Sequence, residues 1–265
     1  MNSIEKEMLS VLRELKEKYG VFEIKAEFEA EGSRMEELMR LKDVTSAAGL
    51  PIILKIGGVE AVTDIYNALS IGVKGIIAPM GETPFAISKF LGIIDKMVPK
   101  DNAEDIDFAF NMETITCYNN FDHILALPKI NLLHGVTVGR VDLTGSLGLD
   151  RTSVESKEVF DICRDTFIKA RKKVLKTGLG GAISTSSIDF IKKLNTEKLI
   201  DKFETRKVVF PAESASYGDK AILKSIEFEL KWLVSKRRFY SGIKSEDEAR
   251  IAMLEKRIAS GIAAD

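Results

Sequence analysis

The feature that most constrains this fold is the alternation of short apolar runs and helical patterns along the chain. A short apolar run bounded by Gly or Pro indicates a buried strand, and apolar residues three or four apart indicate an amphipathic helix. Strands that alternate with helices predict a parallel sheet with helical crossovers. The predicted strands span residues 21–28, 52–56, 75–79, 106–112, 132–138, 180–184 and 207–210, and the predicted helices span residues 3–19, 33–48, 60–71, 84–97, 114–127, 157–176 and 188–199.

The number of predicted strands and the chain length together favour a barrel. A chain of 265 residues is typical of one TIM barrel. Because the pattern supplies seven strands rather than eight, we expect an α/β TIM (β/α)8-type barrel with an absent or irregular first strand. The expected parts of this single barrel domain, 1–265, are an N-terminal helix in residues 1–20, a barrel core in residues 21–215 and a C-terminal helical segment in residues 216–265. A doubly wound open sheet is the alternative.

Composition excludes several classes of partner. The 39 Lys and Arg residues nearly balance the 40 Asp and Glu residues, so no overall charge attracts nucleic acid or an anionic membrane. No apolar run approaches the ~20 residues of a membrane span, and the N-terminus lacks the apolar core of a signal peptide. The two cysteines, Cys117 and Cys163, suit unpaired thiols in a reducing compartment. We therefore expect a cytoplasmic protein.

Three ionisable residues lie near the carboxyl ends of predicted strands, where parallel barrels and open sheets gather their reacting groups. They are Lys55, Glu113 and Asp142. Two carboxylates on adjacent strand ends provide hard oxygen ligands for Mg²⁺ or Mn²⁺. Other roles stay open at this point. Glu113 could cap the following helix, Asp142 could form a turn, and Lys55 could be a surface charge at the barrel rim.

Three segments resemble one known family. Residues 138–148, Val-Gly-Arg-Val-Asp-Leu-Thr-Gly-Ser-Leu-Gly, are similar to the Gly–x–x–Asp–Leu–x–x–x–Leu–Gly signature of the HpcH/HpaI aldolase and citrate lyase β-subunit family. The segments 111–114 with 124–128, and 69–80, resemble the strand–Glu-Thr–helix passage and an earlier Gly- and Pro-containing passage of that family. The resemblance keeps its order over residues 20–215 and implies a class II pyruvate aldolase-like barrel.

The resemblance also implies a site and a reaction. Glu113 and Asp142 would hold a divalent metal, Mg²⁺ or Mn²⁺, and a 2-oxo acid or related acid would bind to it. Backbone amides around Val141 and Asp142, beside Gly139, would bind the substrate carboxylate. Lys55 would stabilise the developing oxyanion. The implied function is a metal-dependent carbon–carbon lyase, of the aldolase or citrate lyase kind, that acts through a metal-stabilised enolate.

Two departures from the family pattern bear on the proton transfer. Lys55 stands where the family usually has Arg. The Glu-His pair of the hydroxy-acid aldolases is also missing, because the matching stretch contains Glu27, Glu29 and Glu31 without a histidine. Alternation would place these carboxylates on one face, and their repulsion would raise the pKa of one of them. We therefore expect Glu29 to act as the general acid or base, with Glu27, Glu31 or a metal-bound water as the alternatives. His134 is expected to be a buried or rim residue, with a role as a base as the alternative.

The missing histidine leaves two other functions open, and the C-terminal segment carries a separate expectation. The chain could be a catalytically degenerate barrel that serves as a ligand-binding or assembly subunit, or an enzyme for a larger acid. Residues 219–259 predict one long charged helix or two, which is more than one barrel needs to close. We expect that segment, which contains Trp232, to pack across a subunit boundary in a homo-oligomer.

Overall fold

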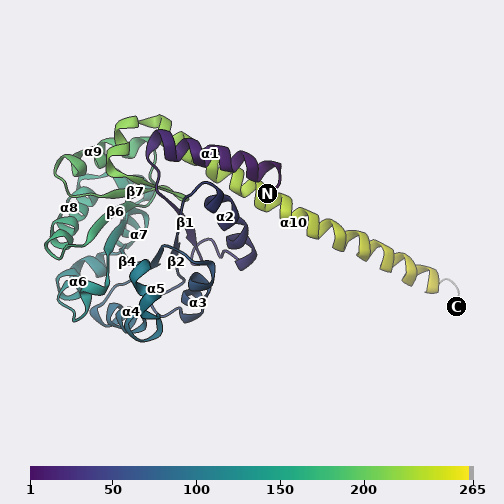
Figure 1. Cartoon of the computed structure of the whole chain (residues 1–265), viewed down its shortest axis with the longest axis horizontal. Coiled ribbons are helices and arrows are strands. Elements are labelled where there is room, and N and C mark those ends of the chain that lie inside the picture. Colours follow the sequence, from purple (N-terminus) through teal and green to yellow (C-terminus); the bar gives the residue numbers. More distant parts are fainter. Residues whose placement is uncertain (263–265) are drawn as a thin grey trace.

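The computed structural model describes residues 1–262, in which eight strands close into a barrel in the order β1 to β8 (Figure 1). The strands are β1 (Glu23–Glu27), β2 (Ile52–Lys55), β3 (Gly75–Ala78), β4 (Asp107–Met112), β5 (Gly135–Gly139), β6 (Lys176–Gly180), β7 (Lys202–Glu204) and β8 (Val208–Pro211). The helices are α1 (Ser3–Tyr19), α2 (Met35–Ala47), α3 (Val62–Ile71), α4 (Pro84–Met97), α5 (Lys100–Asp105), α6 (Ile115–Leu125), α7 (Arg140–Ser146), α8 (Lys157–Lys172), α9 (Ile188–Thr196) and α10 (Asp219–Ile262). The TIM-type barrel is confirmed, and its closure excludes the doubly wound sheet.

The strand that the sequence pattern lacked is β7 and not the first one. β1 is a regular strand paired with β2, so the expectation of an absent or irregular first strand was wrong. β7 has three residues, and its one apolar side chain, Phe203, stands between two charged ones. A segment so short carries too little periodicity to be recognised. The predicted strand 180–184 is likewise displaced, because β6 ends at Gly180.

The barrel closes with one reversed strand. The pairs from β1–β2 to β6–β7 are parallel, whereas β8 pairs antiparallel with both β7 and β1. Residues 205–207 alone connect β7 to β8. A parallel connection needs a crossover of about a dozen residues or more, so this linker can form only a hairpin. As a result, the hairpin turn lies at the end of the barrel where the parallel strands finish.

Successive side chains of each strand point alternately out of the barrel and into it, which produces two apolar cores and one charged layer. The large core fills the space between the sheet and the surrounding helices. A small core of Ile53, Ile77 and Val209, with Ala109 against it, fills the barrel itself. Next along the strands, toward their carboxyl ends, Lys55 is inward-facing and buried. Polar and charged groups are therefore gathered at this end of the barrel.

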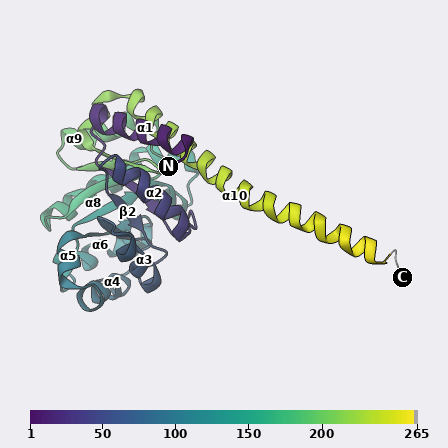
Figure 2. The ribbon, with the colours of Figure 1, turned by 45° about the vertical axis from the view of Figure 1, so that its right-hand side comes forward.

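The C-terminal segment is one helix, α10, rather than two. Its first half packs against α1 and buries Phe228 and Trp232. Its second half extends away from the barrel, as both Figure 1 and Figure 2 show. Residues 263–265 of the expected C-terminal segment lie outside the described residues. Within residues 1–262, no helix combines the length and apolar character needed to cross a membrane.

We predict that the β7–β8 hairpin is essential for the stability of the barrel. Phe203 and Phe210 are register partners in this hairpin, both fully buried, with stacked rings 5.0 Å apart between centroids. Phe203→Ala should lower the free energy of unfolding by roughly 3–5 kcal/mol, because it leaves a cavity in the core. Urea denaturation measures this loss. Phe85→Ala, at a side chain that is 73% exposed, is the control, and an equal loss in both variants would contradict the prediction.

Candidate active site

A cavity of about 480 Å³ opens at the carboxyl ends of the parallel strands. Its walls come from the ends of β1, β2, β4, β5 and β6, from the β7–β8 turn and from α10. This is the end of the barrel at which TIM-type enzymes place their catalytic groups. Three residues that the strand-end rule selected from the sequence, Lys55, Glu113 and Asp142, all line it.

Glu113 lies at the end of β4 with its carboxylate buried, at 2% exposure. Thr114, and not Glu113, caps α6, because its side chain accepts the hydrogen bond from the helix N-terminus. The Glu113 carboxylate accepts hydrogen bonds from the backbone N–H of Met80 and from Nδ2 of Asn111, both at 3.0 Å. Burial raises the pKa of Glu113 above its ordinary value, although Lys55 and these donors oppose the shift.

Gly139 allows the Glu113 carboxylate to lie against the end of β5. A Cβ at Gly139 would stand 2.7 Å from Oε2 of Glu113, which is too close for a side chain. Asp142 follows in the first turn of α7 and is exposed. Its carboxylate has no hydrogen bond or ion pair within residues 1–262. The structure thus brings Glu113, Gly139, Val141 and Asp142 to one wall of the cavity.

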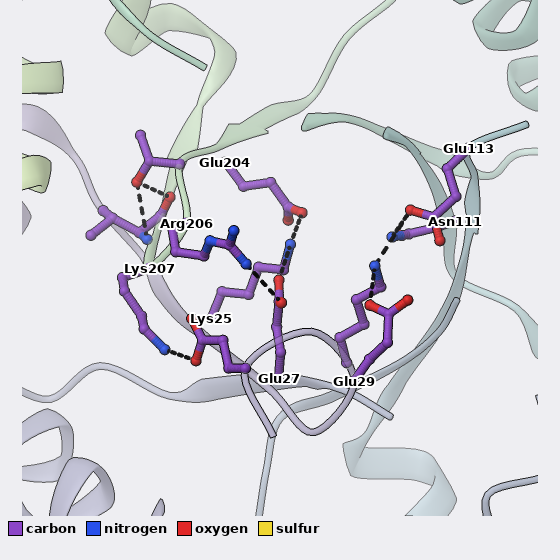
Figure 3. A network of polar contacts seen from close by, with 12 residues as sticks. Lys25, Glu27, Glu29, Asn111, Glu113, Glu204, Arg206 and Lys207 are labelled. Carbon is purple, nitrogen blue, oxygen red and sulfur yellow. Dashed lines mark hydrogen bonds and ion pairs between the residues drawn. The ribbon is translucent and has the colours of Figure 1, made fainter. Parts of the chain in front are cut away.

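Lys55 is a buried ion-pair partner and not a surface charge. Its side chain is 7% exposed, and Nζ lies 2.7 Å from Oε2 of Glu29 and 3.4 Å from Oε2 of Glu113. Burial alone would lower the pKa of Lys55, but Glu113 and Glu29 outweigh this effect and raise it. Lys55 therefore stays protonated between two carboxylates at neutral pH. Figure 3 shows Glu29, Asn111 and Glu113 on the same side of the cavity.

The expected repulsion among Glu27, Glu29 and Glu31 was wrong. β1 ends at Glu27, so the other two residues lie in the following turn. Each carboxylate also has its own cation. Glu27 pairs with Lys25 at 3.1 Å and with Arg206 at 3.3 Å (Figure 3). Glu29 pairs with Lys55 at 2.7 Å, and Glu31 pairs with Lys207. Burial alone would raise the pKa of Glu27, yet these cations lower it.

The sequence interpretation missed a charged cluster on the opposite wall. Lys25 is buried and lies 2.7 Å from Oε1 of Glu204 on β7, and Arg206 extends from the β7–β8 turn (Figure 3). The position of Lys25 could have been predicted from the sequence, because alternation in β1 places it on the same face as Glu27. The position of Glu204 could not have been predicted, because the strand that carries it has no recognisable sequence pattern. Oε2 of Glu204 and Oδ1 of Asn111 are buried without a partner in the described part of the chain, so both can accept a hydrogen bond from a ligand.

Arg140, inside the signature-like segment, anchors the cavity wall. Its side chain is completely buried and donates hydrogen bonds to the carbonyls of Gly180 and Gly181 and to Glu155, at 3.2, 3.0 and 2.8 Å. The ring of Phe190 lies beneath its guanidinium group, at 4.9 Å. These contacts join the start of α7 to the end of β6. Arg140 therefore fixes the wall that carries Asp142.

Neither histidine lines the cavity. His134 precedes β5, where its Nδ1 accepts a hydrogen bond from the N–H of Phe108 at the far end of the barrel. His123 is exposed on α6. His134 is therefore a rim residue, and the ionisable side chains that line the cavity are carboxylates, lysines and arginines. Within residues 1–262, no three His, Cys, Asp or Glu side chains cluster as metal ligands.

A comparison with known families assigns the chain to one of them. Residues 33–204 match the family model of HpcH/HpaI aldolase/citrate lyase, which is more than half of the chain. The chain belongs to the HpcH/HpaI aldolase/citrate lyase family. The matched range contains Lys55, Glu113 and Asp142. No curated protein matches by sequence.

Several solved structures resemble this chain in fold. An HpcH/HpaI aldolase from Desulfitobacterium hafniense DCB-2 is 16% identical with a TM-score of 0.60, and 76% of this chain and 82% of that one are covered. The citrate synthase SbnG is 17% identical with a TM-score of 0.61, and 75% of this chain and 81% of that one are covered. The malate synthase of Haloferax volcanii, in a lead(II) complex, is 12% identical with a TM-score of 0.52, and 72% of this chain and 61% of that one are covered. At these identities, the likeness shows the fold alone.

We predict that Glu27 stabilises the barrel in a pH-dependent way. Its folded-state pKa is lowered from 4.5, so its contribution is complete above that value and is lost as the pH falls through the folded pKa. At neutral pH, Glu27→Gln should lower the free energy of unfolding by about 1.5–3 kcal/mol, the range for a hydrogen bond to a charged group.

Chemical denaturation between neutral and acidic pH measures the difference between wild type and Glu27→Gln. That difference should shrink in acid, because wild-type Glu27 then becomes neutral too. Glu246→Gln, at an exposed position on α10, is the control and should show no such dependence. A difference that is constant with pH would contradict the prediction.

Proposed function

We propose that this protein is a metal-dependent carbon–carbon lyase for a 2-oxo acid or a related acid. The family consists of aldolases and citrate lyases, and synthases that form carbon–carbon bonds share its fold. One observation carries the proposal. Glu113 and Asp142 line a single cavity at the catalytic end of the barrel, with the bare Cα of Gly139 between them along the wall.

The donor set fits Mg²⁺ or Mn²⁺. These ions bind carboxylate oxygens, and Mg²⁺ commonly takes only one or two from the protein while it keeps several waters. Glu113 is a buried carboxylate, and Asp142 has no other partner within the described residues. The divalent lead ion in the malate synthase complex is consistent with a cation in this fold. When bound, the metal would polarise the keto group of the substrate and stabilise the negative charge that develops on it.

Lys55 is the proposed electrostatic catalyst. Its ammonium group is held between two carboxylates on the cavity wall, so it can donate a hydrogen bond to an oxygen that becomes negative. It acts as a point charge rather than as the planar fork of an arginine. The protein positions this charge before the reaction, because Glu29 and Glu113 fix Nζ from two sides.

The proposed carboxylate site uses backbone amides at the start of α7. Gly139, Val141 and Asp142 line the cavity there. A Cβ at Gly181 would stand 2.4 Å from the backbone N of Arg140 and 2.7 Å from that of Val141. Because Gly181 has no Cβ, these N–H groups are left room to approach an anion.

Glu29 is the proposed proton carrier. Its carboxylate is 24% exposed, lies at the cavity and is 2.7 Å from Lys55. An ionised carboxylate there can accept the hydroxyl proton of the substrate as a carbon–carbon bond breaks and can return it afterwards. Glu29 would thereby take the role of the missing histidine.

The absence of a histidine from the cavity also favours a second function. A catalytically degenerate member of the family, acting as a ligand-binding or assembly subunit, would retain the metal and carboxylate sites but not the proton transfer. For either function, we propose a cytoplasmic homo-oligomer that binds a small acid and neither nucleic acid nor membrane, in line with the net charge of −1.

The metal site is tested by substitutions at its proposed ligands. Glu113→Ala and Asp142→Ala should each weaken Mn²⁺ binding at least about tenfold, since each removes an anionic ligand. Gly139→Ala should also weaken it, because the new Cβ displaces the Glu113 carboxylate. Gly145→Ala is the matched control, as a Cβ there meets nothing within 4 Å. Titration calorimetry that gives equal affinity in all four variants would refute the metal site.

The lyase function is tested through Glu29. Glu29→Gln should lower turnover by about 10²–10⁴-fold, the range for a lost general acid or base, while Mn²⁺ affinity is unchanged. In wild type, the methyl protons of pyruvate should exchange with D₂O when Mg²⁺ or Mn²⁺ is bound. If metal binds and no exchange occurs, the lyase proposal fails and the binding-subunit function takes its place.

A further inference from the structure

The helix α10 has two apolar faces, and only one of them is covered. Phe228 and Trp232 belong to the buried face, which packs on the barrel and α1. A second stripe lies on the other side of the helix and is between 47% and 60% exposed. It consists of Leu223, Ile226, Leu230 and Leu233. A helix with an apolar stripe of this kind, open to solvent beside a packed face, is suited to bind another helix.

The stripe continues through the protruding half of α10 as a seven-residue repeat. Alternate steps of three and four residues lead from it to Arg237, Tyr240, Lys244 and Asp247, and then to Ile251, Leu254 and Ile258. Each of the last three side chains is between 44% and 62% exposed, and every residue from 241 to 260 is exposed. Apolar residues that recur at alternating spacings of three and four are the pattern of a two-stranded coiled coil. Here they occupy both ends of the repeat, and four polar positions lie between them.

We propose that α10 pairs with α10 of a second copy of this chain in an antiparallel, two-fold coiled coil. The repeat is self-complementary in that direction, because three of the four exposed apolar positions of the first half each meet an apolar position of the second half. Leu233 lies opposite the partner's Ile251, Leu230 opposite the partner's Leu254, and Ile226 opposite the partner's Ile258. A two-fold axis near residue 242 generates all of these contacts twice.

Charge decides the direction of the two helices. In the antiparallel register, Arg237 lies opposite the partner's Asp247, and neither has an ion pair within residues 1–262. A parallel pair would instead place Arg237 against the partner's Arg237, and Asp247 against the partner's Asp247. Like charges at the seam disfavour that arrangement.

The same register brings the second copy to the cavity. Ile226 and Glu229 line the cavity rim on α10. The partner's Ile258 would cover Ile226, and the partner's Arg257 would lie on the flank of the seam beside Glu229. Each cavity is therefore bordered by the end of the other chain's helix. This inference does not depend on the reaction, because the stripe and the repeat carry it alone.

Two charge-reversed variants test the pairing. Light scattering at tens of micromolar should give twice 29.4 kDa for wild type. Arg237→Asp and Asp247→Arg should each raise the dissociation constant at least about tenfold, because each places like charges opposite one another at two symmetric points. Lys256→Glu is the matched control, since the repeat places this exposed residue away from the partner, and it should leave the mass unchanged. Circular dichroism checks that every variant is folded.

Mixing the two weakened variants gives the decisive result. In an Arg237→Asp and Asp247→Arg mixture, each helix meets the opposite charge again, so a heterodimer should form with wild-type affinity. The double variant Arg237→Asp/Asp247→Arg should likewise form a homodimer. A wild-type particle of 29.4 kDa, or a mixture that does not associate, would overturn the proposal. So would monomers that bind phosphatidylserine vesicles through the stripe.

Discussion

The buried carboxylate of Glu113 is the constraint on which the architecture of the site depends. A charge in this position is costly unless donors surround it. Here, a backbone N–H, the Asn111 amide and the Lys55 ammonium converge on it, and Gly139 provides the space. These groups come from β2, β4, β5 and the end of β3, so the ends of four strands are arranged around one carboxylate.

The reversed strand β8 determines what the opposite wall can contain. Because β7 and β8 form a hairpin, a tight turn rather than a long strand–helix loop reaches the cavity there. The turn brings Thr205 and Arg206 to the wall, while Glu204 binds Lys25 from across the barrel. Parallel strands would have left this position to a loop before a helix. The cavity therefore has one wall of carboxylates around Glu113 and one of paired cations and anions.

Local sequence signals predicted the fold class and the residues at strand ends, but not their partners. Glu113 and Asp142 could be found because an apolar run precedes each of them. The pairing of Glu31 with Lys207 could not, since 176 residues separate them and the linking hairpin lacked a pattern. The predicted repulsion among the three glutamates failed for the same reason. A like-charge argument from one strand omits the cations that other strands bring to it.

The helix α10 both packs against the β7–β8 turn and carries the exposed apolar stripe. Lys207, in the β7–β8 turn, is buried with its Nζ 5.9 Å from the centroid of the Trp232 ring. Burial lowers the pKa of Lys207, although Glu31 opposes this, so the turn is held in place at an energetic cost that the packing of α10 must offset. Ile226, one turn and a half before Trp232, faces the cavity rim. Contacts that hold α10 in place, including those of a second copy bound to its stripe, therefore also hold the cavity wall that carries Arg206.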